Sequence, residues 1–299
     1  MRGQLASDAK GSKPMKYQIT HTNIFRYDSE VEQSLNTIRL KPRSGECQRV
    51  LSYDLNMSPQ SMIKEYIDIW QNNVGSFYIA GPHKELIITA TSTVSVQKAP
   101  YIYQINYSNE MRNIFTSQLF RNHYLPFLTT AELTTLTPAQ VQEIMLAIDG
   151  KNDNPLELAC HVMTYLHSVI RYDPAATIVS TTAKEAFELK AGVCQDYTHI
   201  MLGFLRQCGV PARYISGYLY VGEGDDLIGD TATHAWVEIM VPGIGWIGLD
   251  PTNNVEVLDN HVILSVGRDY RDVSPVEGVY QGGTHTLEVK VDVKKIEHL

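Results

Sequence analysis

The sequence has no apolar run approaching the ~20 residues that a membrane-spanning helix needs. The first residues also lack the apolar stretch of a secretory signal. No cluster of Lys and Arg is present, and 25 basic against 33 acidic side chains give a formal net charge of −8. These absences argue against membrane and nucleic-acid partners. We therefore expect a cytoplasmic protein, with a disordered tail over residues 1–15.

Cysteine is scarce as well. Only Cys47, Cys160, Cys194 and Cys208 occur in 299 residues, and no two of them form a Cys-x-x-Cys pair. This number is too small for a disulfide scaffold, and the usual zinc-site spacing is missing. We expect free thiols in a reducing compartment, no metal site and no cofactor. Hydrophobic residues make up 43% of the chain, which is enough to build a core.

The first part of the chain has the pattern of β-strands. Apolar and polar residues alternate over 17–21, 37–40 and 87–96, and turn-forming residues separate the runs at 42–45 and 71–75. Several short strands with such turns are typical of an antiparallel β-sandwich. The sequence predicts this sandwich over residues 16–115.

The pattern then changes to helices mixed with strands. Helix-start signals lie at Thr137-Pro138, Asn154-Pro155 and Thr182. Strand-like runs follow at about 213–221, 235–241, 246–249 and 286–293. We predict a linker and helix over 116–150 and an α+β domain over 151–299. The fold class expected for the whole chain is α+β.

Cys194 stands where a helix is predicted to begin. Apolar residues at 197, 201, 204, 205 and 208 form one helical stripe that ends before Gly209. Free backbone N–H groups and the helix dipole stabilise a thiolate in the first helical turn. Its own N–H could act as one oxyanion donor. The alternative is a buried core thiol, which we prefer for the other three cysteines.

The segment 233–252 predicts two strands joined by a Pro/Gly turn. Ala235, Val237, Ile239 and Val241 share one face of the first strand, and Ile247 and Leu249 lie on the second. If these apolar faces share a core, His234 and Asp250 both point to the other side, at one end of the ribbon. This parity requires a loop with an odd number of residues, or a bulge.

Together these residues make a complete nucleophilic device. A carboxylate beside an imidazole orients the ring, and the imidazolium activates a thiolate and later protonates the leaving amine. Cys194, His234 and Asp250 are therefore the candidate catalytic triad. The alternative interpretation is a surface histidine and a strand-end aspartate that caps a turn.

The residues carrying this pattern resemble the transglutaminase-like superfamily, a branch of the papain-like cysteine enzymes. The matching segments are Gly192-Val193-Cys194-Gln195-Asp196, Val210-Pro211-Ala212-Arg213, His234-Ala235-Trp236-Val237-Glu238, and Asp250-Pro251-Thr252. The resemblance implies that Cys194 is the nucleophile, His234 the general base and acid, and Asp250 the orienting residue. Residues ~16–110 look like the β-rich N-terminal region of bacterial members. The resemblance carries over no calcium dependence.

Two further residues are candidates for the cleft. Tyr172 follows a helix and could supply a second oxyanion donor, or it could simply pack. Trp236 could wall the cleft or cover the seam between domains. Neither choice follows from the sequence.

The expected function is cleavage of a peptide or protein amide through a thioester acyl-enzyme. Hydrolysis is preferred because no acyl-acceptor site is recognisable. One alternative is a protein-glutamine transglutaminase, in which an amine accepts the acyl group. Another is a non-catalytic binding module on the same fold. No oligomeric state follows from the sequence.

Overall fold

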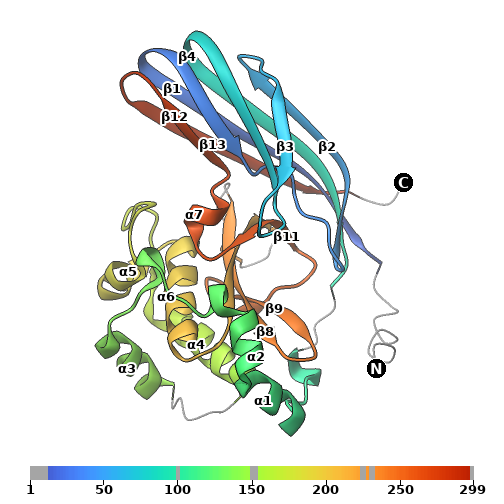
Figure 1. Ribbon diagram of the computed structural model, residues 1–299, viewed down its shortest axis with the longest axis vertical. Coiled ribbons are helices and arrows are strands. Elements are labelled where there is room, and N and C mark those ends of the chain that lie inside the picture. The colour runs from blue at the N-terminus through green and yellow to red at the C-terminus, as the bar shows by residue number, and fades with distance from the viewer. Residues whose placement is uncertain (1–12, 99–101, 149–153, 223–226, 229–232, 297–299) are drawn as a thin grey trace.

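The computed structural model describes residues 13–98, 102–148, 154–222, 227–228 and 233–296. A β-rich part lies over a second part in which helices cover one side of a sheet (Figure 1). Residues 1–12 of the tail expected at 1–15 fall outside the described residues. Residues 13 and 14 belong to no strand or helix, and Met15 does not belong to a tail because it begins the first strand.

The β-rich part contains strands β1 (Met15–Ile38), β2 (Gln48–Ser58), β3 (Ile63–Ile67), β4 (Asn73–Val96), β12 (Val276–Tyr280) and β13 (His285–Lys295). The long strands β1 and β4 pair along most of their length, with register shifts between Arg26 and Gln33. Near there both strands bend back sharply (Figure 1), and the bend in β4 contains Gly81, whose φ is 112°. The sheet thereby folds into two layers.

Side chains from both layers meet in one core. Leu86, Ile88 and Ala90 come from the half of β4 that pairs with β2, and Phe77 and Ile79 come from the half that pairs with β3. All five belong to a single buried apolar cluster. The expected antiparallel sandwich is therefore present, and it forms because alternate residues of each strand face the opposite layer.

The domain bounds expected from the sequence need two corrections. The sandwich was predicted to continue to residue 115, yet β4 ends at Val96 and a helix occupies Asn109–Thr116. The second correction concerns the C-terminal end. Residues 151–299 were all assigned to the second domain, yet β12 pairs with the later half of β1 and β13 with its earlier half. The C-terminal hairpin thus completes the sandwich. The apolar–polar alternation along one strand does not indicate which distant strand it pairs with.

The second part has a sheet in the order β10-β9-β8-β7-β11. Its strands are β7 (Ala212–Leu219), β8 (His234–Val241), β9 (Gly245–Asp250), β10 (Val255–Glu256) and β11 (His261–Gly267). A short parallel pair, β5 (Arg171–Tyr172) and β6 (Ala191–Gly192), lies apart from it.

The helices are α1 (Asn109–Thr116), α2 (Gln118–His123), α3 (Pro138–Ala147), α4 (Pro155–Val169), α5 (Ala183–Leu189), α6 (Cys194–Gln207) and α7 (Tyr270–Val273), with single turns at Ile102–Gln104, Leu125–Phe127 and Glu132–Thr134. α3, α4 and α5 begin at the capping residues that the sequence indicated. Helices α4 and α6 pack on the sheet. No helix of the described ranges is both long and apolar enough to span a lipid bilayer.

The hairpin of β8 and β9 has the parity that the sequence required. Three residues, 242–244, separate the two strands, and Val237 pairs with Leu249 and Ile239 with Ile247. These residues belong to the core shared with α6. His234 and Asp250 consequently project from the other face of the ribbon.

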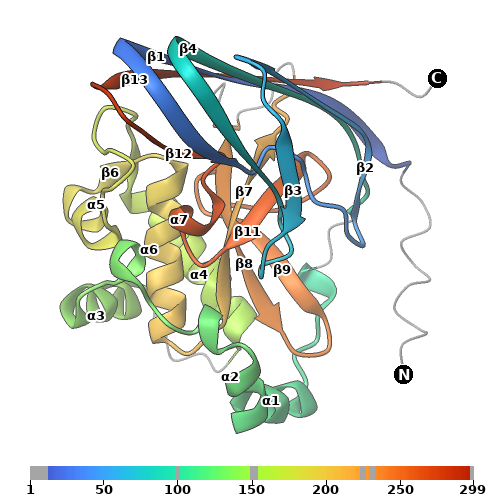
Figure 2. The same cartoon turned by 45° about the horizontal axis from the view of Figure 1, so that its top comes forward.

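The turn between β3 and β4 joins the sandwich to the second part (Figure 2). The amide of Asn72 is completely buried, and it both accepts from the Val266 N–H and donates to the Val266 carbonyl, each at 2.8 Å. Beside it the Trp70 ring packs on Phe127, with centroids 5.3 Å apart. The Asn72 amide thus bonds to the backbone of β11 as a neighbouring strand would, and it links the two parts of the molecule.

Replacing Asn72 by Ala should lower the free energy of unfolding by about 2–4 kcal/mol, because it leaves two buried backbone groups of Val266 without partners. Urea unfolding followed by circular dichroism measures this loss. The exposed Asn113→Ala on α1 is the matched control. An Asn72→Ala protein as stable as the control would show that the amide bridge does not hold the two parts together.

Candidate active site

Cys194 is the first residue of α6, as the sequence predicted. The turn that precedes it is closed by Asp196, whose Oδ2 accepts from the Val193 N–H at 2.8 Å and from the Thr177 hydroxyl at 2.6 Å. A Cβ on Gly192 would lie 2.5 Å from this carboxylate oxygen, so only glycine fits there. Cys194 is partly exposed. The candidate nucleophile therefore stands at a fixed helix N-terminus.

The loop between β5 and α5 is fastened to the same helix turn. Gln195 donates to the Val179 carbonyl at 2.8 Å, next to the bond between Thr177 and Asp196. This leaves the side chains of Ile178 and Val179 exposed. Apolar surface is thus held beside the residues that flank Cys194.

His234 and Asp250 meet as the parity of the hairpin predicted. The Nε2 of His234 lies 2.7 Å from Oδ2 of Asp250, and both side chains are buried. Nδ1 is then the ring nitrogen left for Cys194, whose side chain acts on His234 and favours the protonated ring. The structure brings the three predicted residues together in the order sulfur, imidazole, carboxylate.

The charges of this group reinforce one another. Burial by itself lowers the pKa of His234, but the charge of Asp250 and the bonds to Asp250 and Cys194 outweigh it and raise that pKa to about 10. Burial likewise raises the pKa of Asp250, but the bonds to His234 and His261 hold it far below its usual range. At neutral pH the pair is therefore an imidazolium and a carboxylate.

Burial governs two of the thiols outside the site. Burial raises the pKa of both Cys160 and Cys208 to about 11. For Cys160 the nearby negative charges of Glu256 and Glu157 also raise the pKa. At neutral pH these two cysteines are protonated and poorly nucleophilic.

The two tentative cleft residues have different surroundings. Tyr172 pairs with Gly192 in the short parallel ladder, which places it beside the chain that leads into Cys194. The Trp236 side chain is completely buried, with its ring 5.1 Å from His261 and 6.1 Å from His234. Trp236 therefore packs near the two imidazoles and presents no surface to a substrate.

Two residues near the site were missed from the sequence. His261, the first residue of β11, points its Nε2 at Oδ2 of Asp250 across 3.3 Å. Tyr270 begins α7, its N–H bonds to the buried Nε2 of His199, and Cys194 is among the groups that raise the pKa of its hydroxyl. Both depend on how distant strands are arranged, which no local spacing indicates.

His234, Asp250 and His261 are also a group of potential metal ligands, with donor atoms within 4.8 Å of one another. The 2.7 Å separation of His234 Nε2 and Asp250 Oδ2 is a hydrogen-bond distance. It is shorter than the roughly 3.3 Å between neighbouring ligands around a tetrahedral zinc ion. We therefore interpret the group as hydrogen bonded.

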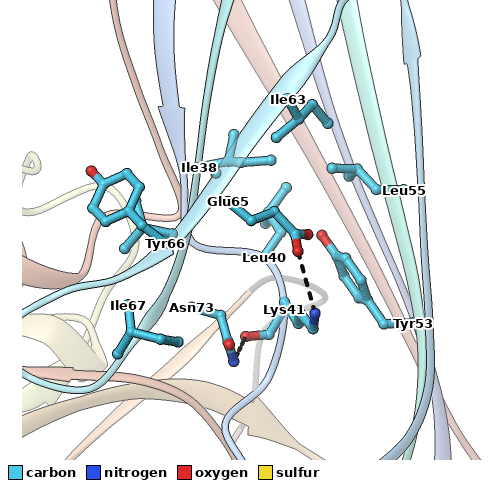
Figure 3. Close-up of a pocket in the computed structure, with 12 residues that line it drawn as sticks. Ile38, Leu40, Lys41, Tyr53, Leu55, Ile63, Glu65, Tyr66, Ile67 and Asn73 are labelled. Atoms are coloured by element: carbon cyan, nitrogen blue, oxygen red, sulfur yellow. Dashed lines mark hydrogen bonds and ion pairs between the residues drawn. The ribbon is translucent and has the colours of Figure 1, made fainter.

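A separate pocket of about 290 Å³ lies in the sandwich, between β2 and β3 (Figure 3). Lys41 extends along it toward Glu65, with which it forms an ion pair at 3.6 Å, and lies over the Tyr53 ring. None of the triad residues lines this pocket. It is thus a feature of the sandwich and not part of the site around Cys194.

Comparison with known proteins identifies two regions. Residues 17–95 match the model of the bacterial transglutaminase-like N-terminal region, and residues 142–251 match that of the transglutaminase-like superfamily. An uncharacterized protein of Mycobacterium leprae is 31% identical over 94% of this chain and 99% of its own length.

Two further relatives carry a functional description of their own. A protein-glutamine gamma-glutamyltransferase of Pseudomonas aeruginosa is 35% identical over 27% of this chain and 13% of its own length. The crystal structure of a candidate cysteine protease from Cytophaga hutchinsonii superposes with a TM-score of 0.73 at 19% identity, covering 96% of this chain and 92% of that one. The second likeness concerns the fold.

The pair of His234 and Asp250 should make stability depend on pH. The folded pKa of His234 lies above its ordinary 6.5, so its contribution is complete below about pH 6.5 and is lost as pH rises toward 10. The depressed pKa of Asp250 makes its contribution disappear in acid. The wild-type free energy of unfolding should therefore fall between pH 6.5 and 10, more steeply than that of His234→Ala.

Urea unfolding across this range measures the slope, with the exposed His161→Ala as the control that should keep the wild-type slope. Equal slopes in wild type and His234→Ala would contradict the assignment of a charged imidazole at this position.

Proposed function

Because this chain belongs to the transglutaminase-like superfamily, we propose that it is a cysteine-nucleophile amide hydrolase with Cys194, His234 and Asp250 as its catalytic triad. The observation that carries the proposal is the 2.7 Å hydrogen bond between His234 and the buried Asp250, with Cys194 acting on the same imidazole. A helix N-terminus and an imidazolium both favour the thiolate. The four free cysteines suit the expected cytoplasmic location.

Catalysis then proceeds in two halves. The Cys194 thiolate attacks the amide carbon, and the Cys194 N–H stabilises the oxyanion that forms. As the C–N bond breaks, His234 gives its Nδ1 proton to the departing amine, which leaves a thioester. Neutral His234 next takes a proton from water, hydroxide adds to the thioester, and the thiolate departs to release a carboxylic acid. Asp250 stays ionised throughout and keeps the ring in place.

A peptide or protein is the substrate class that this surface suits best. Ile178 and Val179 expose apolar side chains on a loop tied to the first turn of α6. A small polar amide would leave these side chains in water, whereas a peptide side chain would cover them. No nucleic-acid or membrane partner is proposed, in keeping with the net charge of −8.

Cross-linking is the second candidate activity. The relative from Pseudomonas aeruginosa is a protein-glutamine gamma-glutamyltransferase, and the same thioester can pass to a primary amine instead of water. A non-catalytic binding module on this fold is the third candidate.

Iodoacetamide should alkylate Cys194 near neutral pH much faster than Cys160 or Cys208, because the pKa of the latter two thiols is about 11. His234→Ala should remove the advantage, since the thiolate then loses its counter-ion. Peptide mass spectrometry after timed quenching measures all three sites in one sample. If Cys194 reacts no faster than the other two in the wild type, the binding-module interpretation is correct.

Incubation with a glutamine-containing peptide and a labelled primary amine separates the two enzyme activities. Hydrolysis converts the glutamine to glutamate or cleaves the peptide, whereas transfer adds the mass of the amine. We expect the hydrolytic product. A predominant amine adduct would establish the cross-linking activity instead.

Tyr172→Phe tests the second oxyanion donor. If the hydroxyl stabilises the oxyanion, kcat should fall about 10²-fold with little change in KM, since the interaction forms only in the transition state. Tyr165→Phe on α4, whose hydroxyl lies near Glu143, is the matched control. An unchanged kcat would assign Tyr172 to packing alone.

A further inference from the structure

We propose that His261 is a positioning residue. It donates a hydrogen bond to the same oxygen of Asp250 that His234 contacts, and it thereby lowers the basicity of His234. The inference rests on the proposed function, because it concerns the same triad. It adds a second imidazole to the carboxylate that orients the first.

The geometry of Asp250 is the starting point. Its carboxylate accepts five hydrogen bonds: from His234 at 2.7 Å, His261 at 3.3 Å, the Asn253 amide at 2.7 Å, and the backbone N–H groups of Thr252 and Asn253 at 3.0 and 3.3 Å. Both imidazoles reach the same oxygen, Oδ2. The two rings therefore compete for one acceptor atom.

The surrounding structure holds His261 beside Asp250. It is the first residue of β11, its Cα pairs with that of Leu219 at the end of β7, and its side chain is fully buried. Trp236 packs edge-on against its ring, with centroids 5.1 Å apart. The indole can extend there because β7 has Gly217 beneath it, where a Cβ would lie 2.3 Å from the Trp236 ring. A residue held by these contacts cannot turn away from Asp250.

The electrostatic consequence follows from the direction of the N–H dipole. An Nε2–H of His261 directed at Asp250 places partial positive charge beside the carboxylate and therefore also beside the His234 imidazolium. This weakens the attraction that holds the proton on His234. The other charged groups that act on these two rings are Cys194, which favours the imidazolium, and Lys98, which acts on His261.

His261 itself remains neutral, because burial and the nearby His234 charge both lower its pKa. Nδ1 of the same ring lies 2.8 Å from Oδ1 of Asn260, so an Nε2–H donor requires the Asn260 amide to turn its NH2 group toward Nδ1. A neutral donor suits this role. His234 must hold a proton in the resting site and release it to a departing amine, and an imidazolium that is too basic is a poor acid. His261 keeps His234 from becoming more basic than the reaction tolerates.

The test uses the full chain with histidine rings labelled with ¹³C, and follows the His234 resonance by NMR while pH rises. The resonance is assigned by its loss in His234→Ala. His261→Phe keeps a ring but removes the donor, and should raise the titration midpoint of His234 by about 1 unit, a tenfold change in the proton equilibrium. His261→Gln carries an amide N–H at nearly the distance of Nε2, and should bring the midpoint back to that of the wild type.

Either a folded His261→Phe protein with the wild-type midpoint, or a His261→Gln protein that titrates like His261→Phe, overturns the proposal and reduces His261 to packing. Thermal unfolding checks that each variant is folded. Should His261→Phe not fold, His261→Asn, which is too short to reach Asp250, takes its place. The titration needs no substrate. A shifted midpoint in a protein whose Cys194 is unreactive would therefore refute the hydrolase and still support the role of His261.

Discussion

Asp250 is a negative charge with no exposure to water, and the rest of the site is arranged around that fact. An isolated carboxylate in such a place would cost several kcal/mol in lost hydration. Asp250 is tolerated because donors surround both of its oxygens. Two of the donors are imidazoles, one is an amide side chain, and two are backbone N–H groups of the turn that follows β9. The charge that orients His234 is therefore supported by the fold and does not depend on solvent.

The need for hydrogen-bond donors around Asp250 also explains why Asp250 and its imidazole partners stand at the ends of their strands. His234 and His261 open β8 and β11, Asp250 closes β9, and Cys194 opens α6. Within the strands, the backbone N–H groups are used by the ladder, so few remain for a side-chain carboxylate. Beyond the last ladder pair they are free to turn toward Asp250. Below them α6 packs on the inner face of the sheet through a large cluster of buried apolar side chains, which gives these ends a rigid base.

Local signals were sufficient to predict that Cys194, His234 and Asp250 lie together. The apolar stripe of α6 indicated where the helix begins, and the alternation along residues 235–249 indicated that His234 and Asp250 share a face. Both signals are periodic, and each belongs to one continuous segment. The role of His261 could not be predicted from the sequence, because its contact with Asp250 depends on the strand order β9-β8-β7-β11, which no single segment determines. The sequence left the role of Trp236 open, because the space for its buried ring depends on Gly217 of a neighbouring strand. The pairing of β12 and β13 with β1 was missed for the same reason.

The return of the C-terminal hairpin to β1 makes the sandwich a discontinuous domain, with the transglutaminase-like domain inserted between β4 and β12. The inserted part is anchored to its host through both of its ends, which restrains hinge movement more than a single linker would. It also delays assembly, since β1 must wait for partners about 180 residues after the end of β4. Contacts this distant in sequence form slowly. A ribosome-bound chain would therefore expose the free side of β1 until synthesis is almost finished.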